Sequence, residues 1–209
     1  MLEHVENPVG FLGELGPLLG PDGLLVVEVP DVDRNPFDLI VADHSSHFRL
    51  DDLRRVTEAA GYELVSASAA VVPKELTVVA RWRDAAAPVA PGTPGGAVDA
   101  NTAWLSALGT EGRRLVATTD VGIFGTSIGG CWLWQETAGG ASFFVDEDPN
   151  RLGTYLDRPV LAPDAIPPGA AVLLSLPGPI AQRVGARLRR PGCSFVAVDE
   201  HGDASAFTG

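Results

Sequence analysis

The feature that most constrains the fold is a run of proline, glycine and alanine near the middle of the chain. Residues 84–98 read Asp-Ala-Ala-Ala-Pro-Val-Ala-Pro-Gly-Thr-Pro-Gly-Gly-Ala-Val and show no periodic spacing of apolar residues. This composition is typical of a linker, because it offers no apolar face that could be buried. We therefore predict one folded part at 1–83, a linker at 84–98 and a second folded part at 99–209, with room for one modest core each.

The pattern of the first part predicts two helices and three strands. They are, in chain order, a helix that Asn7 caps and Pro8 begins, a strand at Leu24–Val29, a helix at Asp51–Ala60, and strands at Glu63–Ala70 and Glu75–Trp82. The continuous apolar run at 24–29 favours a strand covered on both faces. The short connection between the last two strands favours antiparallel pairing. An irregular polar loop occupies 31–49.

Strands and helices alternate in the second part. The expected elements are a helix at Asp99–Leu108, a strand at Val121–Phe124, a helix through Trp132 and Trp134, strands at Ser142–Val145 and Ala171–Leu176, a helix at Ile180–Leu188 and a last strand at Cys193–Val198. Such alternation predicts a parallel sheet with helices on its faces. The fold class is therefore α/β.

Composition excludes several classes of function. The 209 residues include 15 Lys and Arg against 27 Asp and Glu, a net charge of −12, so no basic surface for nucleic acid is expected. Two cysteines cannot form a four-cysteine metal site or a disulfide framework. No apolar run is long enough to cross a bilayer, and the N-terminus lacks the features of a signal peptide. We expect a cytoplasmic protein without nucleic-acid or membrane partners.

Several segments of the first part resemble the second half of a class I S-adenosylmethionine-dependent methyltransferase. They are Leu2-Glu3-His4-Val5-Glu6-Asn7-Pro8, Gly20-Pro21-Asp22-Gly23 with the apolar run to Pro30, His47-Phe48, and Ala60-Gly61-Tyr62. The second part, with Gly122–Ser127, Phe144–Asn150, Gly153 and Pro159–Leu161, resembles the Rossmann-like C-terminal domain of sugar C-methyltransferases. The resemblance implies a partial methyltransferase sheet followed by a small Rossmann-like domain.

The resemblance also implies a chemistry and a set of site residues. The family methylates a carbon of a nucleotide-linked deoxysugar, with S-adenosylmethionine as cofactor. By the match to a Tyr-x-Glu-His group, His44 corresponds to the general base and Asp43 to the carboxylate beside it, while Val41 replaces the tyrosine. Glu3 and His4 correspond to residues near the cofactor, and His47 is an expected acceptor contact. The strands that hold the cofactor in this fold, and the family's zinc-binding cysteines, have no counterpart in the sequence, so the chain reads as truncated.

Carbon methylation needs a base because carbon is a poor nucleophile until an enolate forms, and histidine titrates in a suitable range. Two alternatives remain for this loop. His44 and Asp43 could cap the helix that starts near Asp51, or Asp43, His44 and His47 could ligate a metal, although two histidines and one aspartate on a loop are a weak signal. We predict no metal.

A second candidate site lies in the C-terminal part. Gly125, Thr126 and Ser127 connect a strand to a helix, where backbone N–H groups can face an anion, and Asp146 follows Gly125 by 21 positions. This spacing predicts a substrate or nucleotide contact at these four residues. The alternative is a tight turn with an acidic strand end.

The leading functional hypothesis is a methyltransferase-family protein of sugar or natural-product biosynthesis, acting on a small-molecule acceptor such as a nucleotide-sugar. The first alternative is a non-catalytic binding or partner subunit, a homodimer or a chain that complements another, since the strand at Leu24–Val29 would lack a neighbour on one side. The second is a cofactor-independent acid–base enzyme that uses Asp43 and His44.

Overall fold

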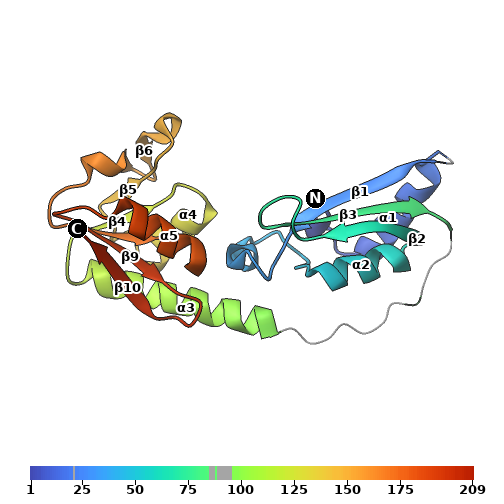
Figure 1. Cartoon of the computed structure of the whole chain (residues 1–209), viewed down its shortest axis with the longest axis horizontal. Coiled ribbons are helices and arrows are strands. Elements are labelled where there is room, and N and C mark those ends of the chain that lie inside the picture. The colour runs from blue at the N-terminus through green and yellow to red at the C-terminus, as the bar shows by residue number, and fades with distance from the viewer. Residues whose placement is uncertain (21, 85–87, 89–95) are drawn as a thin grey trace. The chain divides into compact units, whose positions relative to one another are not determined.

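The computed structural model describes residues 1–20, 22–84, 88 and 96–209. The chain divides into two compact units, Met1–Asp99 and Ala100–Gly209 (Figure 1). Most of the expected linker at 84–98 lies outside the described residues, but 96–98 already belong to a helix. No helix within the described ranges combines the length and the apolar character that crossing a membrane requires.

The first unit holds a three-stranded sheet with two α-helices and three short 3₁₀ helices. Its elements are η1 (Leu2–His4), α1 (Pro8–Leu15), η2 (Gly16–Leu18), β1 (Leu24–Pro30), η3 (Pro36–Ile40), α2 (Leu50–Ala59), β2 (Tyr62–Ser68) and β3 (Glu75–Trp82). The start of α1 follows the prediction, because the Asn7 side chain accepts a hydrogen bond from the Gly10 amide at 3.0 Å and Pro8 occupies the first turn.

The three strands pair in the order β1-β3-β2, and both pairs are antiparallel. The predicted pairing of the last two strands is thus confirmed. The prediction that β1 is covered on both faces is wrong. Val27 and Val29 are buried, whereas Leu24 and Val26 are exposed. The cause is that α1 and α2 cover one face of the sheet, so alternate residues of β1 point away from the core (Figure 1).

The core of this unit lies between that face and the two helices. Leu12 of α1 and Leu53 of α2 pack with Leu76, Val78 and Ala80 of β3, and all five are buried. Tyr62 belongs to the same buried cluster, and its hydroxyl donates a hydrogen bond to the Leu12 carbonyl at 2.9 Å. Phe48, near the end of the loop between β1 and α2, belongs to the same buried cluster, and this loop carries most of the site described below.

The second unit is a seven-stranded sheet with three α-helices. Its elements are α3 (Gly96–Val116), which begins before the division between the units, β4 (Val121–Phe124), α4 (Ile128–Glu136), β5 (Phe143–Val145), η4 (Pro149–Arg151), β6 (Gly153–Tyr155), β7 (Arg158–Leu161), η5 (Pro163–Ala165), β8 (Ala171–Leu174), α5 (Gly178–Leu188), β9 (Ser194–Val198) and β10 (Ala204–Thr208).

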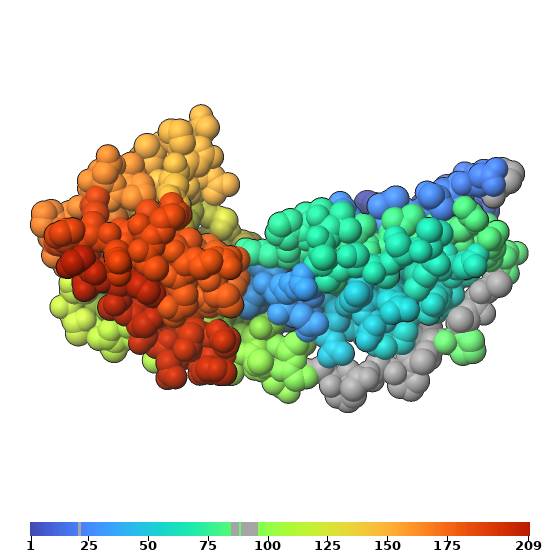
Figure 2. All heavy atoms as spheres, in the orientation of Figure 1, coloured from blue at the N-terminus to red at the C-terminus, as the bar shows by residue number. Residues whose placement is uncertain are grey.

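The strand order is β10-β9-β8-β4-β5-β7-β6, and the α/β fold class is confirmed. The central strands β9, β8, β4, β5 and β7 run parallel, as the alternation predicts, while β10 and β6 add antiparallel edges. Strands β6, β7 and β10 were not predicted from the sequence. β6 and β10 are largely exposed, and β7 begins with Arg158 and Pro159, so none of the three shows a continuous apolar run; β10 lies in the darkest red segment of Figure 2.

The helix expected at Asp99–Leu108 is twice as long as predicted. The helix runs on through Gly109 and Gly112, and both are buried inside α3. A Cβ at Gly112 would lie 3.0 Å from Thr137 Cγ2, so this glycine allows close packing instead of stopping the helix. Arg114 and Glu111 form two hydrogen bonds at 2.7 and 2.6 Å along the added turns.

Candidate active site

The centre of the candidate site is Asp38, a buried carboxylate on η3. Its side chain is 1% exposed, and each of its oxygens faces a different histidine. Oδ1 lies 2.7 Å from His44 Nδ1, and Oδ2 lies 2.6 Å from His47 Nδ1. The loop that carries the histidines is ordered locally by backbone hydrogen bonds, including those from Val41 N to the Asp38 carbonyl and from His44 N to the Val41 carbonyl.

These contacts decide which nitrogen carries the proton in the neutral imidazoles. An ionised carboxylate can only accept hydrogen bonds, so Nδ1 of His44 and of His47 must be the donor. In each neutral ring, Nε2 is then unprotonated and has a free lone pair. The arrangement is the one in which a carboxylate orients a histidine for base catalysis or for ligation.

His4 and Glu3 enter the same site from η1, at the start of the chain. The Ser46 amide donates to the Glu3 carbonyl at 3.1 Å and so ties η1 to the histidine loop. His4 Nδ1 lies 3.1 Å from both the Asp43 carbonyl oxygen and Asp43 Oδ2. Both are acceptors, so His4 also carries its proton on Nδ1.

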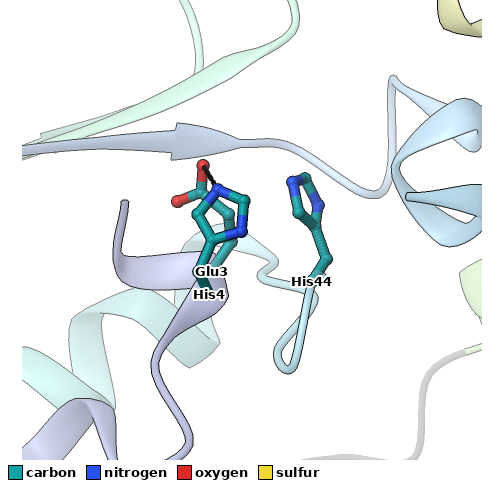
Figure 3. Close-up of side chains that lie close together, drawn as sticks. All are labelled: Glu3, His4 and His44. Carbon is teal, nitrogen blue, oxygen red and sulfur yellow. Dashed lines mark ion pairs between the residues drawn. The ribbon is translucent and has the colours of Figure 1, made fainter. Parts of the chain in front are cut away.

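The free edge of His4 faces Glu3 and His44. Nε2 of His4 lies 3.7 Å from Glu3 Oε1, and the rings of His4 and His44 meet edge to face with centroids 4.8 Å apart (Figure 3). The rings of His44 and His47 are 6.3 Å apart. Three imidazoles and three carboxylates, those of Glu3, Asp38 and Asp43, thus share one small region.

Exposure differs across the cluster. The side chain of His44 is 9% exposed, that of His47 29% and that of His4 40%. The site is therefore open to solvent on the side of His4 and His47 and closed beneath His44 by Asp38. A small molecule can reach the cluster from the open side.

The surroundings of the cluster are strongly negative. Burial raises the pKa of Glu75, and the charges of Glu3, Glu28 and Asp38 raise it further. For Glu3 itself, burial opposes ionisation, but hydrogen bonds from the Met1 amino group and from its own backbone amide bring the net pKa below the ordinary value. The cluster thus combines an ionised Glu3 with a field that favours cations.

Asp43, the carboxylate that the resemblance names beside the base, contacts His4 in the structure, and its predicted role remains a prediction. The carboxylate hydrogen-bonded to His44 is Asp38 and not Asp43, because the Asp43 side chain is 77% exposed and turns toward His4. The alternative that Asp43 and His44 cap the following helix is wrong, because the N-cap of α2 is Arg49. The first turn of α2 is closed by Asp52, which accepts from the Arg49 amide at 3.4 Å.

Asp38 is the residue that the sequence analysis missed. It lies six residues before His44 in a stretch that reads as an irregular loop, and only the turn of η3 directs its carboxylate at both histidines. The only available signal was a Pro-Phe-Asp sequence, typical of the first turn of a short helix, close to two histidines. Glu3, His4, His44 and His47 are brought together; their predicted roles as cofactor, base and acceptor contacts remain predictions.

The second predicted site is largely occupied by its own hydrogen bonds. Asp146 Oδ2 accepts from Thr126 Oγ1 at 2.9 Å and from the Thr126 amide at 3.3 Å, and Oδ1 accepts from the Asp148 amide at 3.0 Å. Gly125 adopts φ +94°, and a Cβ at Gly130 would lie 2.1 Å from the Gly125 carbonyl oxygen. These glycines are therefore required for α4 to pack against the turn. Ligand binding by Gly125, Thr126, Ser127 and Asp146 remains a prediction.

Comparison with known proteins concerns the first unit. Residues 1–67 match a family model described as a methyltransferase domain. No curated protein matches the chain. The matched segment contains every residue of the cluster around Asp38, so the match relates this part of the molecule to methyltransferases.

Proposed function

We propose that the first unit supplies the acceptor side of a methyltransferase, and that the histidines held by Asp38 deprotonate the acceptor. The observation that carries this proposal is the double contact of Asp38 at 2.7 and 2.6 Å, which gives His44 and His47 an Nε2 lone pair each. The methyltransferase match over residues 1–67 supports the reaction class. The resemblance to sugar C-methyltransferases gives the acceptor class, a ketone-bearing carbon of a nucleotide-linked deoxysugar.

The proton transfer follows from the geometry. Nε2 of His44 or His47 removes the proton from the carbon next to the acceptor carbonyl, and the C–H electron pair moves into the enolate. The resulting imidazolium keeps its Nδ1–H on Asp38, whose negative charge stabilises the cation. A positioned histidine in this role contributes about 10²- to 10⁴-fold in rate.

A methyltransferase domain implies a donor of the S-adenosylmethionine type. The described residues of the first unit do not by themselves form a binding site for such a donor. Within 1–20 and 22–84, no strand runs through a glycine-rich turn into a helix, since β1 continues into Asp31 and η3. Such a turn is what brings a backbone close to a nucleotide-type cofactor. The proton transfer is therefore the step that these residues support.

This step can be tested without the donor. The full chain is incubated in D₂O with a nucleotide-linked ketodeoxysugar, and loss of the α-proton signal is followed by NMR. We expect exchange that falls at least tenfold in His44→Ala or His47→Ala. Asp33→Asn, which alters an exposed carboxylate near the start of the same loop, is the matched control and should retain the rate. Exchange that is absent in the wild type, or unchanged in both histidine variants, would contradict the proposal.

A partner subunit is the second candidate function, and the sheet order favours it. Among the described residues β1 pairs with β3 alone, so its other edge presents unpaired backbone groups beside exposed Leu24 and Val26. An open apolar edge is a ready site for another strand. Light scattering of the wild type and of Val26→Lys tests this. An oligomeric wild type with a monomeric variant would support the partner role, and a monomeric wild type would contradict it.

A further inference from the structure

We propose that Glu3, His4 and His44 form a binding site for one divalent transition-metal ion of the Zn²⁺ class. One potential ligand atom from each residue lies within 4.8 Å of the other two. They come from η1 and from the loop after η3, and Figure 3 shows them facing a common space. The site uses two imidazole nitrogens and one carboxylate oxygen, a ligand set that suits Zn²⁺ and its neighbours.

The hydrogen bonds around the site leave acceptor atoms of His4, His44 and Glu3 without a donor between His4 Nε2 and Glu3 Oε1. His4 Nδ1 is the donor toward Asp43, so the neutral ring presents an Nε2 lone pair to Glu3 Oε1, which is also an acceptor, at 3.7 Å. His44 Nδ1 is the donor toward Asp38, so its Nε2 is unprotonated as well. Each of the three residues thus offers an acceptor atom within 4.8 Å of the other two, and the Met1 ammonium is bonded to the other oxygen of Glu3, Oε2, at 2.7 Å.

The spacing is compatible with a shared ion. Two ligands bound at about 2.1 Å to a tetrahedral ion lie roughly 3.4 Å apart, close to the 3.7 Å between His4 Nε2 and Glu3 Oε1. Small side-chain rotations bring the third ligand in, and His4 has the freedom for this at 40% exposure. Three protein ligands leave a fourth position open, as in catalytic zinc sites.

Both histidines also have the outer partners that metal-binding histidines need. Asp38 holds His44 through Nδ1, and Asp43 holds His4 through Nδ1. A carboxylate in this position fixes the tautomer and the ring orientation, and its loss typically lowers metal affinity 10- to 100-fold. The negative charges of Glu28, Asp38 and Glu75 nearby add to the attraction for a cation.

The neighbouring group of Asp38, His44 and His47 is the competing arrangement, since it too has one ligand atom each within 4.8 Å. Here, however, the atoms in contact are the Nδ1 donors and the carboxylate that accepts from them. A metal there would have to replace two short hydrogen bonds, while the Glu3 site needs none to be broken. His47 then keeps its Nε2 free and serves as the base beside the metal.

This last role rests on the proposed function, but metal binding does not. A bound ion with an open position would polarise the acceptor carbonyl as a Lewis acid and make the α-proton more acidic. Metal binding is measured on the free chain, whereas α-proton exchange is measured on the acceptor. A chain that exchanges protons without binding metal would overturn the inference and leave the proposed function standing.

The test is calorimetric titration of the metal-free full chain with Zn²⁺, together with the visible absorption of the Co²⁺ form. We expect one ion per chain and a Co²⁺ spectrum with nitrogen and oxygen ligands in tetrahedral geometry. Glu3→Gln and His4→Gln should each weaken binding at least tenfold, and Asp38→Asn by 10- to 100-fold. Far-UV circular dichroism verifies the fold of each variant, and the exposed His4 allows substitution without loss of the core.

Two controls separate the possible sites. His201→Gln removes an exposed histidine of the second unit and should leave affinity unchanged. His47→Gln should also leave affinity within a few-fold of the wild type. Loss of binding in His47→Gln with retention in His4→Gln would overturn the assignment in favour of the Asp38 group, and absence of stoichiometric binding in the wild type would overturn it altogether.

Discussion

At the scale of single residues, the site depends on one buried carboxylate with two partners. Asp38 has almost no access to water, and its charge is balanced by two imidazole N–H donors. Buried charges are retained in proteins where such donors satisfy them. The consequence is that His44 and His47 are held in one tautomer before any ligand arrives, which is what both base catalysis and metal ligation require.

The negative field near Asp38 predicts a pH-dependent effect at Glu75. Because burial and the nearby carboxylates raise the pKa of Glu75, the folded state binds its proton more tightly than the unfolded state. The contribution of this group to stability is then fully present below the unfolded pKa, about 4.3, and is lost as pH rises through the folded value. Glu75→Gln should therefore be more stable than the wild type at neutral pH.

The measurement is urea unfolding of both proteins from acidic to neutral pH, with chelator present so that no cation offsets the charge. The advantage of Glu75→Gln should shrink as pH falls toward 4. Glu14→Gln, at an exposed position of α1, is the matched control and should show little change. A difference at Glu75 that does not vary with pH would contradict this explanation.

At the scale of elements, the site depends on how α1 and the sheet bring η1 next to the loop after η3. The end of α1 meets β3 at Gly16, where a Cβ would lie 2.1 Å from Cε3 of Trp82. Gly13, one turn earlier, has no such contact, since a Cβ there would come no closer than 3.8 Å to the Ala60 carbonyl oxygen. Gly16 is therefore required for the close contact with Trp82, whereas the space around Gly13 would accept a Cβ.

This difference predicts opposite results for two similar substitutions. Gly16→Ala overpacks the contact with Trp82 and should lower the free energy of unfolding by about 1–3 kcal/mol. Gly13→Ala lies in a helix with space around it and should leave stability unchanged or raise it by up to about 1 kcal/mol. Thermal unfolding followed by circular dichroism distinguishes them. Equal effects of the two substitutions on the free energy of unfolding would show that the Trp82 contact does not determine the cost of replacing Gly16.

Sequence patterns predicted elements better than they predicted contacts. Asn7 and Pro8 predicted the start of α1, and alternation predicted the parallel core of the second sheet, because both depend on local or periodic properties. The resemblance pointed to Asp43, next to His44 in the sequence, and gave no sign of Asp38. Asp38 lies six residues before His44 and reaches it only through the turn of η3. The helix expected to end at Leu108 likewise continues through Gly109 and Gly112, whose close packing against α4 and the residue after it depends on residues far away in the sequence.

At the scale of the whole molecule, chemistry-bearing residues are distributed unevenly between the two units. Three of the four histidines of the chain lie in the first unit, around Asp38, and the segment that matches a methyltransferase domain contains all three. The turn of the second unit at Gly125 uses its acid, Asp146, to hold Thr126 and Asp148. The first unit is therefore where we place the reaction.

The four histidines make one measurement decisive for the full chain. Every role given to His4, His44 and His47 requires the proton on Nδ1 and a free lone pair on Nε2. Long-range ¹H–¹⁵N correlation spectra of the imidazoles, recorded on the metal-free protein at alkaline pH, report this tautomer directly, with the exposed His201 as internal reference. We predict the Nδ1–H form for all three site histidines, and the Nε2–H form of His44 would contradict the site as described.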